Sequence, residues 1–324
     1  MFSHRSILKQ AWNNTLKYKY LWLFGLFATL TVAGGSWEYN LINQSFSQNI
    51  IDGSYLQLEK LISLFEVVAN FGVGLLSLFK SGFWSFLSGL SVLIIIGMFL
   101  AIIIWLAISS QGALINALKK ILTSKKEVKI SYRENITVGH KNFWPVLGMN
   151  ILIRLFIYFC FFLISIPLLV LALKDFSLLA IIYIILFVLF VPISTGFTLM
   201  IKYAISYQIF ESEGFVKSIE KGYKLFRKNW LISLEMAVIL FIVSFLAGLI
   251  FSFVISIFII PLFITGLAMN AVWLSLFMVY LGIALLIIFG AILSTFQISA
   301  WTQLFYELKQ DNGVLAKLER LIKK

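Results

Sequence analysis

Residues 221–230 read KGYKLFRKNW and stand directly before a long apolar stretch at 231–260. Two related runs occur earlier in the chain, LKYKYLW at 16–22 and GHKNFW at 139–144. Each run places a basic residue three positions before a tryptophan, and the pairs are Lys19 and Trp22, Lys141 and Trp144, and Arg227 and Trp230. Trp favours the headgroup level of a bilayer, and a Lys or Arg one turn earlier reaches the phosphates. The three runs therefore predict three points at which the chain enters a membrane.

The composition also places the chain in the membrane class. Of its 324 residues, 61% are hydrophobic and only 12% are charged, whereas a soluble domain carries about 25% charged residues. The net charge of +12 could fit nucleic acid, but the basic residues lie between apolar stretches and not on one soluble face. We therefore expect the lipid bilayer and its anionic headgroups as partners, and no nucleic acid.

Six stretches are apolar enough to span a bilayer, because a helix needs about 20 such residues to cross about 30 Å of hydrocarbon. They are 18–34, 84–108, 145–173, 176–201, 231–260 and 270–300. About twenty residues precede the first apolar run, so we predict an uncleaved span there and not a secretory signal. The stretch 55–80 is interrupted by polar residues at steps of four, three and four, which predicts a helix lying along the interface.

The positions of the basic residues give an independent test of this count. Of the 26 Lys and Arg residues, four lie in the N-terminal arm up to Lys19. Seven separate the second span from the third, six separate the fourth from the fifth, and five follow the sixth. The opposite side holds only Lys60, Lys80 and Lys174, and Arg154 lies inside a span. Because cytoplasmic loops carry the excess of Lys and Arg, we expect a cytoplasmic-membrane protein with both termini in the cytoplasm.

The spans also form a repeated pattern. The even-numbered spans each end on an Ile-Ser pair before a more polar exit, at Ile108-Ser109, Ile205-Ser206 and Ile298-Ser299. We therefore predict one membrane domain over 1–324, built as an all-α bundle of six spans in three repeated hairpins with interfacial helices on the cytoplasmic side. The repeats cover about 5–124, 128–214 and 215–311, with an external insertion at 35–83 and a basic tail at 312–324.

The segment 216–230 is expected to be one of the interfacial helices. Its apolar residues recur at steps of three and four: Val216, Ile219, Tyr223, Phe226 and Trp230. Its lysines lie largely off that stripe, at 217, 221, 224 and 228. A basic amphipathic helix lies in the plane of the membrane surface. It serves either as an anchor alone or also as a binding site for lipid headgroups or a protein partner.

The stretches 209–236 and 132–152 resemble the repeated element of a bacterial and archaeal multi-pass family, the glycerophosphoryl diester phosphodiesterase membrane domain. The matching residues are Glu213, Gly214, Ser218, Gly222, Arg227 and Trp230 in one copy, and Gly139, Lys141, Trp144, Leu147 and Gly148 in the other. The resemblance covers about 128–311 and implies a membrane domain that some members fuse to a soluble phosphodiesterase. The sequence holds no such catalytic domain, so we do not expect phosphodiesterase activity.

The residue types needed for catalysis are scarce. The two histidines, His4 and His140, fall at predicted interfaces, and the single cysteine, Cys160, lies in an apolar run. No common hydrolase, phosphate-loop or metal motif occurs in the sequence. We therefore expect no enzymatic activity, no cofactor and no metal.

Two features inside the membrane remain. Arg154 and Glu235 lie on equivalent spans of neighbouring repeats and could form an ion pair, which we interpret mainly as a structural clamp. A polar pathway and an arginine that extends alone toward the interface are the alternatives. A column of small residues at steps of four, which lets helices approach closely, is formed by Ser77, Ser81, Ser85 and Gly89.

These observations favour a non-enzymatic membrane module that interacts with lipids or protein partners. The alternative is a transporter or channel for a lipid-like or small substrate, although its path would need more polar lining than the spans offer. A membrane-embedded enzyme comes third.

Overall fold

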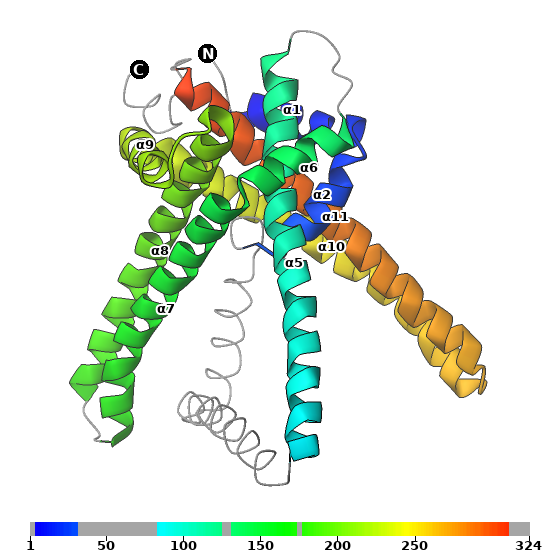
Figure 1. Ribbon diagram of the computed structural model, residues 1–324. Coiled ribbons are helices and arrows are strands. Elements are labelled where there is room, and N and C mark those ends of the chain that lie inside the picture. Colours follow the sequence, from blue (N-terminus) through cyan, green and yellow to red (C-terminus); the bar gives the residue numbers. More distant parts are fainter. Residues whose placement is uncertain (1–3, 32–82, 125–130, 174–176, 311–324) are drawn as a thin grey trace. The chain divides into compact units, whose positions relative to one another are not determined.

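The computed structural model describes residues 4–31, 83–124, 131–173 and 177–310. This part of the chain is 93% helical and contains no strand, which confirms the all-α prediction. Figure 1 shows its helices, which follow in the order α1 (His4–Lys17), α2 (Leu21–Ala28), α5 (Phe83–Thr123), α6 (Tyr132–Lys141), α7 (Phe143–Leu173), α8 (Ser177–Glu211), α9 (Phe215–Lys228), α10 (Trp230–Ala268) and α11 (Val272–Lys309).

Five of the described helices are long and apolar enough to cross a membrane. They are α5, Phe143–Cys160 of α7, Ile184–Glu211 of α8, α10 and α11. These helices coincide with the predicted second to sixth spans. The 39 residues of α10 extend over about 58 Å at about 1.5 Å per residue, so the helix is longer than a bilayer is thick.

The predicted first span, 18–34, is different in the structure. Helix α2 ends at Ala28 and is followed by i to i−3 hydrogen bonds from Leu30 to Phe27 and from Thr31 to Ala28. The Thr31 hydroxyl also donates to the Ala28 carbonyl, and such local bonds compete with helix continuation. The described part of 18–34 is therefore not one continuous helix, and the eight residues of α2 are too few to cross hydrocarbon.

The chain divides into two compact units. The first comprises Met1–Gly35, Ala107–Ile153 and Thr195–Lys324, and the second comprises Ser36–Leu106 and Arg154–Ser194. The long helices α5, α7 and α8 each contribute one end to the first unit. The predicted interfacial segment 55–80, the basic tail 312–324 and all but the last residue of the insertion 35–83 lie outside the described residues.

The first unit is built where short helices cover the ends of long ones. We call α1, α6 and α9 the entry helices, and α5, α8 and α11 the return helices. In the return helices the residues 107–118, most of 198–209 and most of 294–308 are buried. The most polar parts of the three long helices therefore form the interior of this unit.

Each entry helix packs on a return helix through a small residue. Gly139 of α6 lies so close to α5 that a methyl group there would overlap the carbonyl oxygen of Ser109. A methyl group on Gly222 of α9 would lie 2.8 Å from the backbone nitrogen of Ala204 in α8. Ala11 of α1 is fully buried in the core that α1 shares with α11. Small residues allow the helix backbones to approach closely.

An aromatic cluster between α8 and α11 forms the centre of the core. Phe305 packs against Tyr203, Tyr207 and Phe210, with ring centroids 4.8–6.3 Å apart. Tyr203 is fully buried, and its hydroxyl lies 2.7 Å from the Ser233 hydroxyl of α10. This hydrogen bond satisfies the one polar atom of the tyrosine side chain and links α8 to α10.

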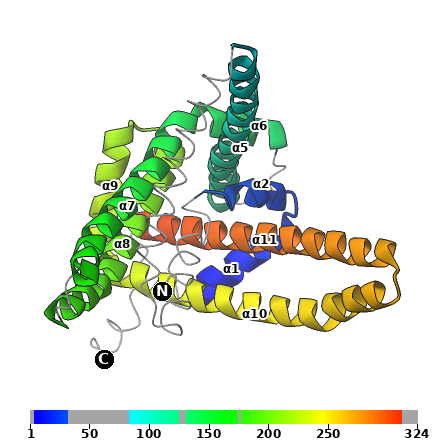
Figure 2. The same cartoon turned by 90° about the horizontal axis from the view of Figure 1, so that it is seen from below.

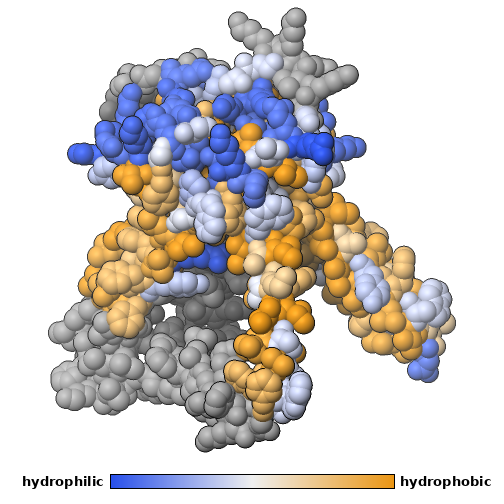
Figure 3. Space-filling model, in the orientation of Figure 1, coloured by the Kyte–Doolittle hydropathy of each residue, from blue (hydrophilic) through white to orange (hydrophobic). Residues whose placement is uncertain are grey.

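Helices α10 and α11 contact each other as a long antiparallel hairpin, and Figure 2 shows them running in opposite directions from the turn that joins them. Phe251 stacks on Phe289 at 4.2 Å, and Gln297 donates to the Ser244 hydroxyl at 2.7 Å. Away from the entry helices, the visible surface of the hairpin is mostly hydrophobic in Figure 3, whereas hydrophilic residues gather over the entry helices. The hairpin has an apolar surface that matches bilayer hydrocarbon.

Candidate membrane-interface site

Helix α9 presents three different faces, and the first of them packs against the protein. Ser218, Gly222 and Leu225 are buried along one side. The Ser218 hydroxyl donates to the side-chain oxygen of Gln208 in α8 at 3.1 Å. Figure 1 views α9 nearly along its axis while α8 runs down beside it, so the two helices cross at a large angle.

The second face of α9 is apolar and exposed. Val216 is 74% exposed and Tyr223 is 49% exposed, and Ile219 and Phe226 beside them are partly buried. At about 100° per residue these four side chains share one sector of the helix. The predicted apolar stripe is therefore present, but its members differ: Phe226 packs against the core beside the buried Leu225, whereas Val216 and Tyr223 are exposed.

The third face of α9 is basic. Lys217, Lys224 and Arg227 are exposed and lie next to the apolar sector around the helix. Lys224 also pairs with Glu220 one turn away at 2.5 Å. A helix with adjoining apolar and basic exposed sectors has the chemistry of an interfacial helix, in which the apolar sector enters the acyl boundary and the basic sector meets phosphates.

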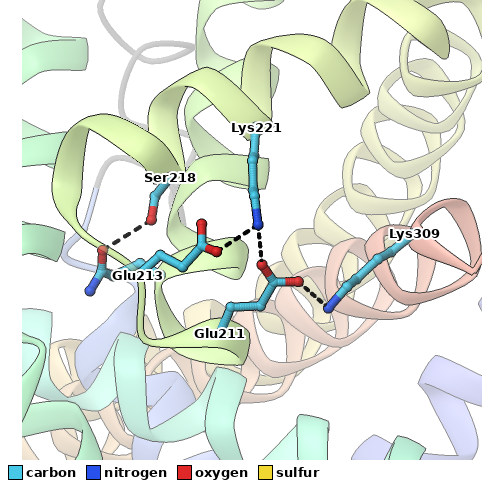
Figure 4. A network of polar contacts seen from close by, with 6 residues as sticks. Glu211, Glu213, Ser218, Lys221 and Lys309 are labelled. Carbon is cyan, nitrogen blue, oxygen red and sulfur yellow. Dashed lines mark hydrogen bonds and ion pairs between the residues drawn. The ribbon is translucent and has the colours of Figure 1, made fainter.

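An ionic clamp, formed by Glu211, Glu213, Lys221 and Lys309, fastens α9 to α8 and α11. The Lys221 ammonium donates to Glu211 at 2.7 Å and to Glu213 at 2.6 Å. Lys309 approaches the other oxygen of Glu211 at 2.5 Å, as Figure 4 shows. Lys221 therefore ties α9 to the end of α8, whereas Lys224 of the exposed sector pairs with Glu220 of α9 itself.

The clamp also changes the acidity of Lys221. Its hydrogen bonds to Glu211 and then to Glu213 raise the pKa of the Lys221 ammonium above the usual value for lysine. The same carboxylates favour the charged form electrostatically. Lys221 therefore stays charged throughout the physiological pH range.

The carboxyl end of α8 is held by a further lysine. The Lys119 ammonium of α5 donates to the Phe210 carbonyl at 2.7 Å. The last carbonyls of a helix lack partners within it and carry partial negative charge, so a lysine there is stabilising. Lys119 and Lys309 thus fix the end of α8 from two neighbouring helices.

A single residue separates each of the second and third entry helices from the span that follows it. Asn142 stands between α6 and α7, and Asn229 stands between α9 and α10. Each asparagine donates its side-chain amide to the carbonyl four residues earlier, that of Val138 or Leu225. The same local hydrogen bond therefore ends both entry helices and sets the bend into the span.

The structure places the predicted anchor residues in two ways. Trp144 and Trp230 begin the spans α7 and α10 and are 76% and 56% exposed. Trp22 is turned back, with its indole N–H donating to the Thr15 carbonyl of α1 at 2.8 Å. Their basic partners, Lys19, Lys141 and Arg227, are all exposed. The second and third anchors thus have the exposure that a bilayer interface requires, and the first is bound to the protein through its indole.

The proposed ion pair and the small-residue column stay predictions. Glu235 lies near the start of α10, where a carboxylate oxygen is 3.5 Å from Nε2 of His4 in α1. Arg154 is exposed on the part of α7 that belongs to the second unit. Ser85 and Gly89 are partly buried on α5, and Ser77 and Ser81 lie outside the described residues.

Sequence reasoning missed a set of buried side-chain amides that join the helices of the first unit. Asn116 donates to Asn135 at 2.8 Å, and Asn150 donates to Gln111 at 3.0 Å. Gln208 donates to Asn142 at 3.1 Å and accepts from Ser218. The signal was present, because buried amides in apolar helices need partners. In the sequence these residues resemble only the polar residues expected at the ends of membrane spans.

Within the described ranges, no group of three or more His, Cys, Asp or Glu side chains could hold a metal ion. We compared the chain with models of protein families, with curated protein sequences and with solved structures, and none of them matches it. The structural argument about function therefore rests on the geometry of this chain.

Proposed function

We propose that this chain is a multi-pass module of the cytoplasmic membrane that binds lipids through its layer of entry helices. It carries out no catalysis and needs no cofactor. The observation that carries this proposal is the exposed surface of the first unit, which is apolar along α10 and α11 and basic with exposed tryptophans where the spans begin. Apolar surface of that extent suits lipid and not water.

The orientation belongs to the same proposal. The entry helices face the cytoplasm, because the basic residues of the chain concentrate beside them and cytoplasmic segments carry the excess of Lys and Arg. The turn between α10 and α11 then faces the opposite side. Both termini are cytoplasmic in this arrangement.

A threefold internal repeat is part of the proposal as well. Its support is the recurring order of entry helix, outward helix and return helix, together with the matching asparagine bends at Asn142 and Asn229. The packing adds to this support, since α6 lies on α5, α9 lies on α8 and α1 lies on α11. The resemblance to the phosphodiesterase membrane-domain family remains an interpretation of the same two stretches, and we propose the membrane role alone.

Transport of a lipid-like or small substrate is the rival function. The buried amides of the first unit would favour it if they lined a path for solvent. The Asn116–Asn135, Asn150–Gln111 and Gln208–Asn142 bonds instead pair these groups with one another across helix boundaries. Such pairing is typical of helix association in membranes, so it favours a packed module.

Identification of bound lipids tests the proposal directly. The protein is purified from membranes in mild detergent, and its lipids are identified by native mass spectrometry against a lipid extract of the same membranes. We expect anionic phospholipids to be enriched on the protein relative to the extract. Retention of lipid in the bulk proportions would contradict lipid binding by a basic layer, and flux of a solute in proteoliposomes would favour the rival.

A further inference from the structure

We propose that α9 is a docking helix for anionic phospholipid headgroups, in which Lys217, Lys224 and Arg227 contact the phosphates and Lys221 serves only to hold the helix in place. This inference rests on the proposed function and names the lipid class and the residues that recognise it.

The first argument is that the basic residues of α9 differ in whether the protein already compensates their charge. Lys221 is engaged by Glu211 and Glu213 at 2.7 and 2.6 Å, so its charge is compensated within the protein. Lys217 and Arg227 are exposed and take no part in that clamp. Lys224 is exposed beside Glu220, with which it forms a solvent-facing pair. The exposed sector therefore keeps a net positive charge.

The second argument is the apolar sector that adjoins these charges. Val216 and Tyr223 are exposed, although the same helix buries Ser218 and Gly222. A soluble helix would place its apolar residues on the protein-facing side. Leu225 and Phe226 of the same helix pack in or against the core, so Val216 and Tyr223 are the apolar side chains of α9 that are left to contact something outside the described protein.

The third argument decides between a bilayer and a protein as the occupant. Helix α9 passes into α10 through the single residue Asn229, and α10 is long and apolar enough to cross a membrane. The exposed Trp230 at the start of α10 marks the headgroup level. Since α9 lies within one residue of that level and crosses α8 at a large angle, its exposed sectors lie against the bilayer surface.

The test uses the full chain in lipid nanodiscs with a probe on α9. Val216→Cys is labelled with an environment-sensitive fluorophore in a Cys160→Ala background, which removes the only native cysteine. The protein is compared in discs of phosphatidylcholine alone and of phosphatidylcholine mixed with phosphatidylglycerol. We expect emission at shorter wavelength, and protection from an aqueous quencher, in the discs that contain phosphatidylglycerol, and we expect both effects to weaken as salt is added.

The matched variants separate docking from folding. The triple variant Lys217→Gln, Lys224→Gln and Arg227→Gln is expected to lower the ratio of docked to undocked α9 by on the order of 100-fold, since each basic residue near an anionic surface contributes roughly fivefold. The charge-conserving triple variant Lys217→Arg, Lys224→Arg and Arg227→Lys should dock as the unchanged protein does. Lys221→Gln should keep its preference for phosphatidylglycerol but lose thermal stability.

Three results would overturn the proposal. The first is a probe that is equally exposed in both kinds of disc. The second is protection that is equal in both and unaffected by the triple substitution, since docking would then be purely apolar. The third is protection that appears only when polyglutamate is added, since an acidic protein surface would then be the occupant. Incorporation into discs reports insertion of the spans separately, so failure of α9 docking is distinguishable from failure of the proposed membrane function.

Discussion

Ser212 ends α8 with a positive φ of 53°, and its backbone N–H donates to the Gln208 carbonyl at 3.0 Å. This left-handed backbone conformation costs a residue with a Cβ about 1 kcal/mol or more, whereas glycine adopts it without that cost. We therefore expect Ser212→Gly to stabilise the protein by about 0.5–1 kcal/mol, seen as a higher midpoint of thermal unfolding in detergent. Ser212→Ala, which keeps the Cβ, should give no gain. A lower midpoint for the glycine variant would contradict this reading of the α8 end.

Gly139 and Gly222 are needed for close contact between helix backbones. A methyl group at either position meets backbone atoms of α5 or α8, which cannot move as a flexible side chain can. We expect Gly139→Ala and Gly222→Ala each to lower the free energy of unfolding by about 1–3 kcal/mol.

Three other glycines provide the control for this prediction. Gly97, Gly248 and Gly290 also lie in helices, and a methyl group there would have no neighbour within 4 Å. Their replacement by alanine should be neutral or stabilising by up to about 1 kcal/mol, because alanine favours helix. Equal losses at all five positions, measured by chemical unfolding in detergent, would mean that the crossings are not the cause.

At the scale of whole elements, the bond between Tyr203 and Ser233 links α8 to α10. Both side chains are fully buried and lie 2.7 Å apart. We expect Tyr203→Phe to cost about 1 kcal/mol of stability. A double-mutant cycle with Ser233→Ala should give a coupling energy of about 0.5–1.5 kcal/mol. A coupling energy near zero would show that the two hydroxyls do not act together.

The ionic clamp holds α9 to α8, and its dependence on pH follows from Lys221. The raised pKa of Lys221 means that its stabilising effect is complete below the usual pKa of about 10.4 and is lost only as the pH rises through the higher folded value. Lys221→Gln should therefore lower the unfolding midpoint by the same amount between about pH 7 and about pH 10. A difference that disappears within that interval would contradict the clamp.

The elements that were predictable from sequence are those with a strong repeated signal. Five apolar stretches correspond to five long helices, because an apolar run of about 20 residues has few stable structures other than a long helix. The stripe of α9 was visible from its spacing, but not which side faces the protein, because that depends on how Gly222 meets α8. The short α2 was missed, since turns at Thr29–Thr31 depend on local hydrogen bonds that hydropathy does not register.

At the scale of the whole molecule, contacts between distant parts of the sequence close the first unit. Gln303 of α11 donates to Gln10 of α1 at 2.6 Å, and Thr295 of α11 packs against Gly25 of α2. No local pattern in the sequence could predict these contacts, because they join residues nearly 300 positions apart. The ionic clamp around Lys221 could not be predicted from the sequence either, because it brings together the end of α8, a turn of α9 and the end of α11.

The central claim is that α10 carries the chain across a membrane from the layer of entry helices to the α10–α11 turn. Single cysteines at Lys217→Cys in α9 and Asn270→Cys in the turn, each in the Cys160→Ala background, can be labelled with a membrane-impermeant maleimide in intact and in permeabilised cells. We predict that the cysteine at 270 reacts in intact cells and that the cysteine at 217 reacts only after permeabilisation. Reaction of both positions from the same side would contradict the account.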